Sequence, residues 1–479
     1  MWKAGSVILF AALASAAASA AFAFTNGLDA RFGSGGVVLL GPTPTSGLIS
    51  RGIFGMAVQS DGKIVIATRV FNDTDPGMGA TLPAIGRLNA DASWDASFAD
   101  HGLYVLPFGA TAAPDGGEVH EIVLLSDNSI AAAGGSFVTT FSHDFHTCTL
   151  LMRLDSSGSP VSTFGPGDNG SFCFDFAPDL TNDYWFRHFE GFAADSDDSL
   201  FVTTVRTNLG YGAVAQFDAN GALVSGYGSD GIAALPAGVP TGLLKVRPDH
   251  KLMVVGIRVL SIFPADWTIA TVRLGPTGEV DSQYGTQGEF DLPVPNTGVM
   301  SPLSAVLKDG RLLVASYNDS QPFSFYSLDE SGAADAGFND AGQQPGFPGV
   351  AQLPLPLDVS DDGILAAQPL PDAHIFAVGN VGTNPINLAL IRLNADSSYD
   401  ANYGDSQHPG WAAVNVGGLT TSNTHADALA VDAAGHAVVA FVTADDGNGK
   451  NCTGLIRVVT DRLFDGAFDA APPMPTCPQ

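Results

Sequence analysis

The fold is decided by the stretch Ser60-Asp61-Gly62-Lys63-Ile64-Val65-Ile66-Ala67, which joins a short polar turn to an apolar run. A β-branched run bounded by Asp and Gly is typical of a β-hairpin. The pattern returns six more times along the chain. The other copies are Asp127-Asn128-Ser129-Ile130, Asp197-Asp198-Ser199-Leu200, Asp249-His250-Lys251-Leu252, Asp309-Gly310-Arg311-Leu312, Asp372-Ala373-His374-Ile375 and Ala434-Gly435-His436-Ala437. Seven copies of one hairpin indicate a repeat architecture.

A second motif frames each hairpin and ends in an aromatic residue. It is first seen as Leu28-Asp29-Ala30-Arg31-Phe32-Gly33 and then as Trp94-Asp95-Ala96-Ser97-Phe98. The aromatic anchors are Phe32, Phe98, Phe164, Tyr227, Tyr284, Phe338, Tyr403 and Phe468. Eight anchors enclose seven intervals of similar length, and each interval holds one hairpin.

Each interval reads as four short strands. In the first interval the expected strands are 54–58, 63–68, 84–88 and 103–106. A four-stranded antiparallel unit that is repeated seven times predicts an all-β fold, a seven-bladed β-propeller, because radial packing buries both faces of every sheet. An open solenoid is the alternative. The expected blades are about 54–107, 120–176, 188–236, 241–293, 302–353, 363–416 and 425–468 plus 36–41.

The ring is expected to close through the N-terminal strand. Val37-Val38-Leu39-Leu40 reads as a fourth strand that precedes any first strand. The last unit instead ends in Pro472, Pro473 and Pro475, which cannot donate hydrogen bonds to a strand ladder. Residues 24–479 are therefore expected to form one closed domain.

Residues 1–23 read as a secretory signal peptide. Lys3 supplies the positive charge, residues 7–18 are a short apolar run, and small residues allow cleavage after Ala20 or Ala23. We expect an exported protein, periplasmic or extracellular, without a membrane span. A retained N-terminal anchor is the alternative.

Four cysteines in an exported protein favour disulfides. Cys148 and Cys173 flank the anchor Phe164 at the same offsets at which Cys452 and Cys477 flank Phe468. We therefore predict the bridges Cys148–Cys173 and Cys452–Cys477, and four free buried thiols are the alternative.

The chain is acidic, with 49 Asp and Glu against 20 Lys and Arg and a formal net charge of -29. Such a surface repels nucleic acid and anionic lipid, so neither is expected as a partner. Asp as a turn former explains most of the excess. Divalent cations or basic partners are the alternative reading, and we expect a monomer.

Asp-Gly-Lys-Ile-Val at 61–65, Arg-Leu-Asn-Ala-Asp at 87–91 and 392–396, and the Leu-Asp-x-x-Phe-Gly motif resemble the delta-60 repeat family, also called DUF5122 β-propeller repeats. The resemblance spans about residues 28–468 and weakens where Phe217-Asp218 and Ser327-Leu328 replace Arg-Leu. It implies an exported bacterial propeller, and it implies no catalytic residues.

Aligning the first strands places several polar residues together. His188 and His425 share one position, and His120, Glu190 and Asp427 share the position two residues further on. First strands usually line the central channel, so these residues are expected in one sector of a channel mouth, near Arg51. His with carboxylate suits a divalent metal such as zinc, or acid–base chemistry, whereas hydration of the channel is the plainer reading.

Acidic loops offer a second candidate site. Asp73 and Asp75 lie between the second and third strands of the first blade, and Asp445 and Asp446 lie at the same place in the seventh. Oxygen-rich loops suit calcium, although neither fits the twelve-residue calcium loop. A solvated loop is the alternative.

No nucleophile elbow, zinc-protease helix, phosphate loop or dinucleotide motif is found. The leading hypothesis is a non-catalytic binding or scaffold module for a protein or carbohydrate partner. The alternative is an enzyme of the lyase or hydrolase type with its site at the channel mouth.

Overall fold

The computed structural model describes most of the repeat region. The described residues are 27–29, 31–40, 43–44, 48–72, 81–107, 110, 112, 116–139, 145–167, 169–176, 189–206, 211–236, 238, 242–261, 266–292, 300–308, 310–318, 321–335, 338, 349–352, 364–381, 386–396, 398–405, 408–414, 424–444 and 451–460.

The described strands fall into four classes by their order within a repeat. The first strands are β2 (Leu48–Val58), β6 (Gly117–Leu124), β10 (Phe189–Ala194), β14 (Gly242–Val246), β18 (Met300–Lys308), β22 (Ile364–Pro369) and β28 (Thr424–Val431). The second strands are β3 (Ile64–Asn72), β7 (Ile130–Thr139), β11 (Leu200–Arg206), β15 (Leu252–Ser261), β19 (Arg311–Asn318), β23 (Ile375–Val381) and β29 (Ala437–Ala444). The third strands are β4 (Thr81–Leu88), β8 (Phe145–Leu154), β12 (Tyr211–Phe217), β16 (Asp266–Leu274), β20 (Gln321–Leu328), β24 (Asn387–Leu393) and β30 (Asn451–Val458). The outer strands are β5 (Leu103–Val105), β9 (Ser171–Phe174), β13 (Ile232–Ala234), β17 (Glu289–Asp291), β21 (Val350–Gln352), β27 (Trp411–Val414) and β1 (Val37–Leu39). The small hairpin β25 (Gly404–Asp405) and β26 (His408–Pro409) precedes β27.

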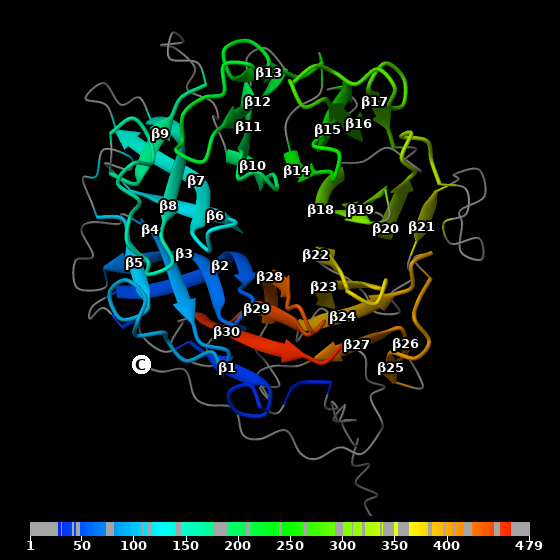
Figure 1. Ribbon diagram of the computed structural model, residues 1–479. Helices are drawn as coiled ribbons and strands as arrows, with labels where there is room; N and C mark the ends of the chain where they lie inside the picture. The colour runs from blue at the N-terminus through cyan, green and yellow to red at the C-terminus, as the bar shows by residue number, and fades with distance from the viewer. Residues whose placement is uncertain are drawn as a thin grey trace, which may run out of the picture.

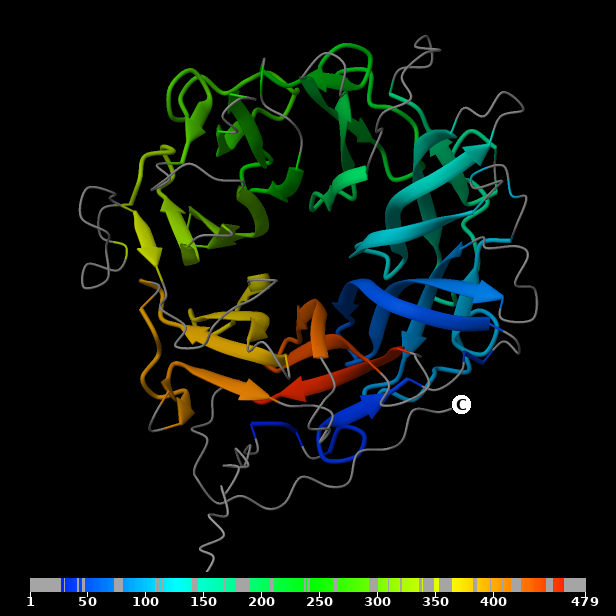
Figure 2. The same cartoon turned by 180° about the vertical axis from the view of Figure 1, so that it is seen from behind.

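The protein is all-β, and the described residues contain no helix. Six four-stranded antiparallel sheets, each built from one continuous stretch of chain, are blades of a β-propeller. We number them blade 1 (β2–β5) to blade 6 (β22–β27). A further sheet has the order β1-β30-β29-β28 and is called the composite sheet. Figures 1 and 2 show the sheets arranged around a common centre with their first strands innermost. The predicted four-stranded antiparallel blades are confirmed.

The composite sheet joins the two ends of the repeat region. β1 pairs antiparallel with β30, so that Val37 lies opposite Ile456 and Val38 opposite Leu455. The first strand of this sheet, β28, contacts β22 of blade 6 and β2 of blade 1.

The repeated hairpin turn uses one more residue than a plain two-residue turn. Gln59 N donates to Lys63 O at 2.8 Å, Gly62 N donates to Gln59 O at 2.9 Å, and Gly62 has a φ of +85°. This is a type I turn followed by a left-handed residue, which matches the twist of the strands. All seven copies place a residue at positive φ at this point: Gly62, Asn128, Asp198, His250, Gly310, Ala373 and Gly435.

The Arg of the third strand connects neighbouring blades. Arg87 Nε donates to Asp95 Oδ2 at 2.7 Å, and the Arg87 guanidinium lies 4.5 Å from the centre of the Phe98 ring. Its Nη1 donates to the Ser156 carbonyl of blade 2 at 2.6 Å. The repeated Arg, Asp and aromatic anchor therefore form a structural link between blades.

The composite sheet carries the same link with residues from both ends of the chain. Arg457 of β30 donates to Asp29 Oδ2 at 2.8 Å and lies 4.8 Å from the centre of the Phe32 ring. Its Nη1 donates to the Ala90 carbonyl of blade 1 at 2.9 Å. Phe32, rather than Phe468, is the described anchor that packs on Arg457; Phe468 lies outside the described residues.

Four of the described anchors, Phe98, Phe164, Tyr227 and Tyr284, also receive a glycine turn of the next blade. Gly278 of blade 4 has a φ of +84°, and a Cβ there would lie 2.9 Å from Gly228 N and 3.2 Å from the Tyr227 ring. Gly228 N in turn donates to the Thr277 carbonyl at 2.8 Å. Only glycine combines this backbone conformation with so close an approach.

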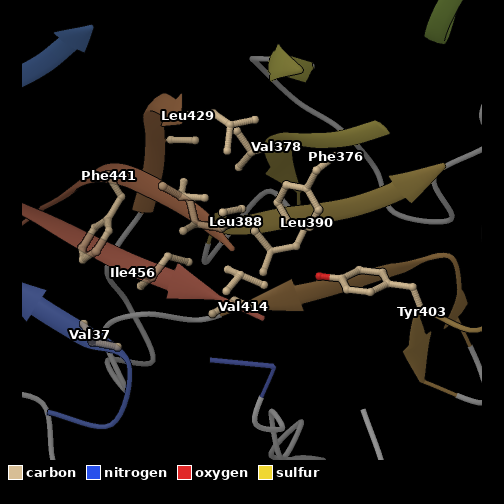
Figure 3. Close-up of a cluster of buried hydrophobic side chains, with 14 of the residues drawn as sticks. Val37, Phe376, Val378, Leu388, Leu390, Tyr403, Val414, Leu429, Phe441 and Ile456 are labelled. Carbon is tan, nitrogen blue, oxygen red and sulfur yellow. The ribbon is translucent and has the colours of Figure 1, made fainter. Parts of the chain in front are cut away.

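The hydrophobic core lies between adjacent sheets. Figure 3 shows one such layer, where Phe376, Leu388 and Leu390 of blade 6 pack against Leu429 and Phe441 of the composite sheet. Equivalent buried clusters lie between the other neighbouring sheets. Each blade is therefore stabilised by its neighbours rather than by a core of its own.

Cys148 of β8 and Cys173 of β9 form a disulfide between adjacent strands. This predicted bridge is confirmed. Cys477 lies outside the described residues, so its pairing with Cys452 stays a prediction.

Candidate functional site

All first strands except β14 have a β-bulge at the corresponding position. In β6 Val119 pairs with Gly134 and Glu121 with Ala133, which leaves His120 as the extra residue. In β28 the extra residue is Asp427, and in β10 it is Glu190. The sequence alignment of these three residues therefore matches the strand register. A bulge interrupts the ladder and redirects its side chain, and bulges are frequent beside functional sites.

Asp427 reaches from the composite sheet to blade 1. Its Oδ2 accepts a hydrogen bond from Ile53 N at 3.2 Å. Burial raises the pKa of Asp427 to about 6, against the opposing effects of the Ile53 N–H and the charges of His425 and Arg69. The carboxyl group therefore changes charge near neutral pH.

Arg69 of β3 links blade 1 to blade 2. Its Nη1 donates to Glu118 Oε2 at 2.8 Å, and its guanidinium lies 5.1 Å from the Phe54 ring centre and 5.8 Å from that of Phe71. Arg69 Nε is buried and makes no hydrogen bond within the described part of the chain. A guanidinium held between rings and a carboxylate has a fixed orientation.

His120 completes this group. Its Nε2 lies 2.9 Å from Glu118 Oε1, and its ring centre lies 5.4 Å from that of Phe54. The hydrogen bond with His120, together with the charges of His120 and Arg69, holds the pKa of Glu118 below its usual value. Phe54, Arg69, Glu118, His120 and Asp427 are called the polar cluster below.

A second titratable pair lies further along the first strands. Glu121 Oε2 accepts from Phe192 N of blade 3 at 3.0 Å. Burial raises the pKa of Glu121, and burial lowers the pKa of Lys245 on β14, while each charge partly offsets the shift of the other. Like Asp427, Glu121 supplies an acceptor to an N–H at the free edge of the next first strand.

The structure places the sequence-predicted residues unevenly. His120, His425 and Asp427 are described, and the first and last of these belong to the polar cluster. The Glu190 side chain is not described, and His188, Asp73, Asp75, Asp445 and Asp446 lie outside the described residues. Within the described ranges, no three His, Cys, Asp or Glu side chains form a group that could hold a metal ion.

Sequence reasoning missed Phe54, Arg69 and Glu118. Glu118 precedes its bulge by two residues, as His425 precedes Asp427, so a complete alignment of the first strands would have found it. Phe54 is the bulge residue of blade 1 and was open to the same argument. Arg69 lies on a second strand, and nothing local in the sequence connects it to this group.

Residues 59–98 match the family model of the DUF5122 β-propeller, a domain of unknown function. The resemblance to the delta-60 repeat family is confirmed for this repeat. The matched segment contains Arg87, Asp95 and Phe98, the side chains that connect neighbouring blades. Much of the repeat signature is therefore explained by how the blades pack.

Several solved structures are similar to this chain at low sequence identity and low TM-score. A protein of unknown function from Dyadobacter fermentans is 12% identical, with a TM-score of 0.46, and the match covers 88% of this chain and 99% of that one. The polysaccharide lyase Uly1 is 9% identical, with a TM-score of 0.44, coverage of 85% of this chain and 90% of that one. A Trypanosoma rangeli sialidase is 10% identical, with a TM-score of 0.39, and the match covers 85% of this chain and 55% of that one. No curated protein matches the sequence. At these scores the likenesses carry no argument about function.

Proposed function

We propose that this protein is an exported, non-catalytic β-propeller that binds a partner at the polar cluster. Arg69 and His120 offer hydrogen-bond donors, and Phe54 offers a ring. Both carboxylate oxygens of Glu118, and Oδ2 of Asp427, each accept one described contact and can accept a second from a ligand hydroxyl. Alternating donors and acceptors beside an aromatic ring suit a polyhydroxylated ligand, and a carbohydrate provides this chemistry.

The observation that carries the proposal is the orientation of Arg69. Phe54, Phe71 and Glu118 fix its guanidinium, while its Nε makes no hydrogen bond to a described residue. A buried donor without an acceptor is costly, by about 1–3 kcal/mol. An oxygen of a bound ligand that reaches Nε, after a shift of the side chains that cover it, would remove this cost.

Binding is preferred to catalysis because the carboxylates already have structural partners. Asp427 accepts from Ile53 N, and the two oxygens of Glu118 contact Arg69 and His120. A general acid or base must be within reach of the substrate proton. The enzyme hypothesis with His120, His188, Glu190, His425 and Asp427 remains the alternative.

Thermal shift with a carbohydrate panel tests the proposal. At least one sugar should raise the unfolding midpoint of the mature protein, because a ligand of the native state stabilises it. Arg69→Lys keeps the charge but loses Nε, and should weaken that sugar roughly tenfold or more. His120→Ala removes a hydrogen-bonding side chain of the polar cluster and should also weaken binding of that sugar. His101→Ala is its matched control and should bind like the wild type, since the His101 side chain lies on an exposed turn. A panel without any shift, or a hit that survives both site variants, would contradict the proposal.

We also propose a seven-bladed ring that is closed by the N-terminal strand over residues 24–479, after removal of the signal peptide 1–23. Support comes from the β1–β30 pairing and from Arg457, which contacts both Asp29 and Ala90. The Cys148–Cys173 disulfide is compatible with export. No helix in the described ranges is long and apolar enough to cross a membrane.

The proposal also includes a structural ion. This ion is calcium at the acidic loops or zinc at the histidines. EDTA should lower the unfolding midpoint if either ion is bound, and only the correct ion should restore it. An unchanged midpoint would remove the ion from the account.

A further inference from the structure

One Lys side chain on a first strand has no ionic partner. Lys245 lies on β14, and its side chain is half-buried among the innermost strands of the sheets (Figures 1 and 2). Every other Lys or Arg side chain that the structure describes makes at least one ion pair with Asp or Glu. The chain has 49 acidic residues against 20 basic ones, so carboxylates are plentiful. A described cation without one is therefore an exception that needs an explanation.

The carboxylate of Glu121 lies across one strand from Lys245. β10 lies between β6, which carries Glu121, and β14. Glu121 Oε2 accepts a hydrogen bond from Phe192 N of β10 at 3.0 Å. The preceding residue of β10, Gly191, lies against the backbone of β14, where a Cβ would be 3.3 Å from Leu244 N. Lys245 is the next residue of β14. Glu121 and Lys245 therefore flank the same short part of β10.

The two charges interact, but they form no ion pair. Burial lowers the pKa of Lys245 and raises the pKa of Glu121, and each charge partly offsets the shift of the other. Glu121 Oε1 and Lys245 Nζ make no hydrogen bond to a described residue. Both side chains are only half-buried, so a small solute can reach them. Each group therefore has hydrogen-bonding capacity that the described residues do not use.

The sum of the two charges decides which class of ligand fits. A simple anion would pair with Lys245 and leave Glu121 without an opposite charge, in a protein whose net charge is already -29. A simple cation at Glu121 would leave Lys245 unpaired in the same way. A zwitterion brings one charge of each sign and leaves neither group unpaired. Its two charges must lie close together, because a single strand separates Glu121 from Lys245.

We propose that Glu121 and Lys245 form a binding site for a free α-amino acid, whose carboxylate pairs with Lys245 Nζ and whose ammonium donates to Glu121 Oε1. An α-amino acid carries both charged groups on one carbon atom and so meets the requirement for closely spaced charges. Both contacts are charge-assisted hydrogen bonds in a partly desolvated place, where such bonds are stronger than on the open surface. The site goes beyond the proposed sugar binding and uses none of the five residues of the polar cluster.

Thermal shift with a panel of the common α-amino acids is the first test. At least one of them should raise the unfolding midpoint, because a ligand of the native state stabilises it. Two derivatives of that amino acid then separate its charges in calorimetric titration. The N-acetyl derivative keeps the carboxylate and loses the ammonium, and the amide derivative keeps the ammonium and loses the carboxylate. Each should bind roughly tenfold more weakly or worse than the parent, because one charge-assisted bond is lost.

Variants of the pair test where the amino acid binds. Lys245→Met and Glu121→Gln each remove one charge and should weaken binding roughly tenfold or more. The Gln side chain keeps an oxygen acceptor for Phe192 N. The double variant removes both charges together, so it leaves no charge unpaired; it should fold and should not bind. Lys251→Met is the matched control, since Lys251 lies in the hairpin loop after β14 and pairs with Asp281. It should bind like the wild type.

The outcomes separate this site from the polar cluster. Lys245→Met should leave sugar binding unchanged, so either proposal can fail alone. A panel without any response would overturn the amino-acid site. An N-acetyl derivative that binds as tightly as its parent would also overturn it, because that result would indicate a simple anion site. Full binding by the double variant would do the same, because the amino acid would then bind elsewhere.

Discussion

Asp427→Asn should stabilise the protein near neutral pH and lose this effect in acid. In the native state Asp427 lies against blade 1 and accepts from Ile53 N. The Asn side chain keeps an oxygen acceptor for this N–H and removes the buried charge. Its neighbours His425 and Arg69 attract that charge, but burial outweighs them and raises the pKa.

The magnitude follows from the pKa. The native pKa of about 6 lies above the ordinary Asp value of 3.8. Between these two values the native state binds more protons than the unfolded state, so the free energy of unfolding falls as the pH rises through this window. At neutral pH, ionisation of Asp427 therefore costs about 3 kcal/mol, at about 1.4 kcal/mol per pKa unit. Below a pH of about 4 both states are largely protonated and the cost disappears.

Urea denaturation of the wild type and of Asp427→Asn, at neutral pH and at a pH of about 4, measures the effect. The stabilisation by Asp427→Asn should be about 2–3 kcal/mol larger at neutral pH than at a pH of about 4. Asp91→Asn is the control, because hydrogen bonds from Ser93 lower the pKa of Asp91. The charge of Asp91 therefore stabilises the native state, and its removal should destabilise the protein rather than stabilise it. A pH-independent difference, or destabilisation at neutral pH, would refute the reasoning and mean that His425 and Arg69 stabilise the charge.

Three further substitutions test how the blades are held together. Arg87→Met removes the hydrogen bonds to Asp95 and to the Ser156 carbonyl, while Lys63 and Ser97 still contact Asp95, so unfolding should become easier by about 1.5–3 kcal/mol in urea; no loss would show that this link is dispensable. Gly278→Ala should lower the free energy of unfolding by more than about 1 kcal/mol, because the new Cβ would meet Gly228 N. Gly226→Ala should be nearly neutral, because a Cβ there has nothing within 4 Å. Equal effects of the two substitutions would contradict the packing argument. Replacing both Cys148 and Cys173 by Ser should cost about 3 kcal/mol, measured as a lower urea midpoint under oxidising conditions, and an unchanged midpoint would argue against the bridge in the folded protein.

The fold could be predicted because its signals are local. Each hairpin turn needs a residue at positive φ, and Gly62, Asn128 and Gly435 mark that position in the sequence. The Asp and the aromatic anchor recur because Arg87, Arg273 and Arg457 use them in the same link to a neighbouring blade. The pairing of Cys148 with Cys173 followed from the same repetition.

The candidate site was only partly predictable because it is assembled across blades. His120 and Asp427 were found by aligning first strands, and the shared bulge explains why that alignment works. Arg69 reaches Glu118 from another strand and another blade, so its role depends on a contact that no spacing in the sequence reveals.

The central claim is that ligand recognition lies at the polar cluster. Calorimetric titration of the sugar identified by the panel, against wild type, His120→Ala and the control His101→Ala, tests this claim most directly. Loss of a hydrogen bond to the sugar should weaken binding roughly tenfold or more in His120→Ala and leave binding by His101→Ala unchanged. Equal binding of the sugar by wild type and His120→Ala would contradict the claim.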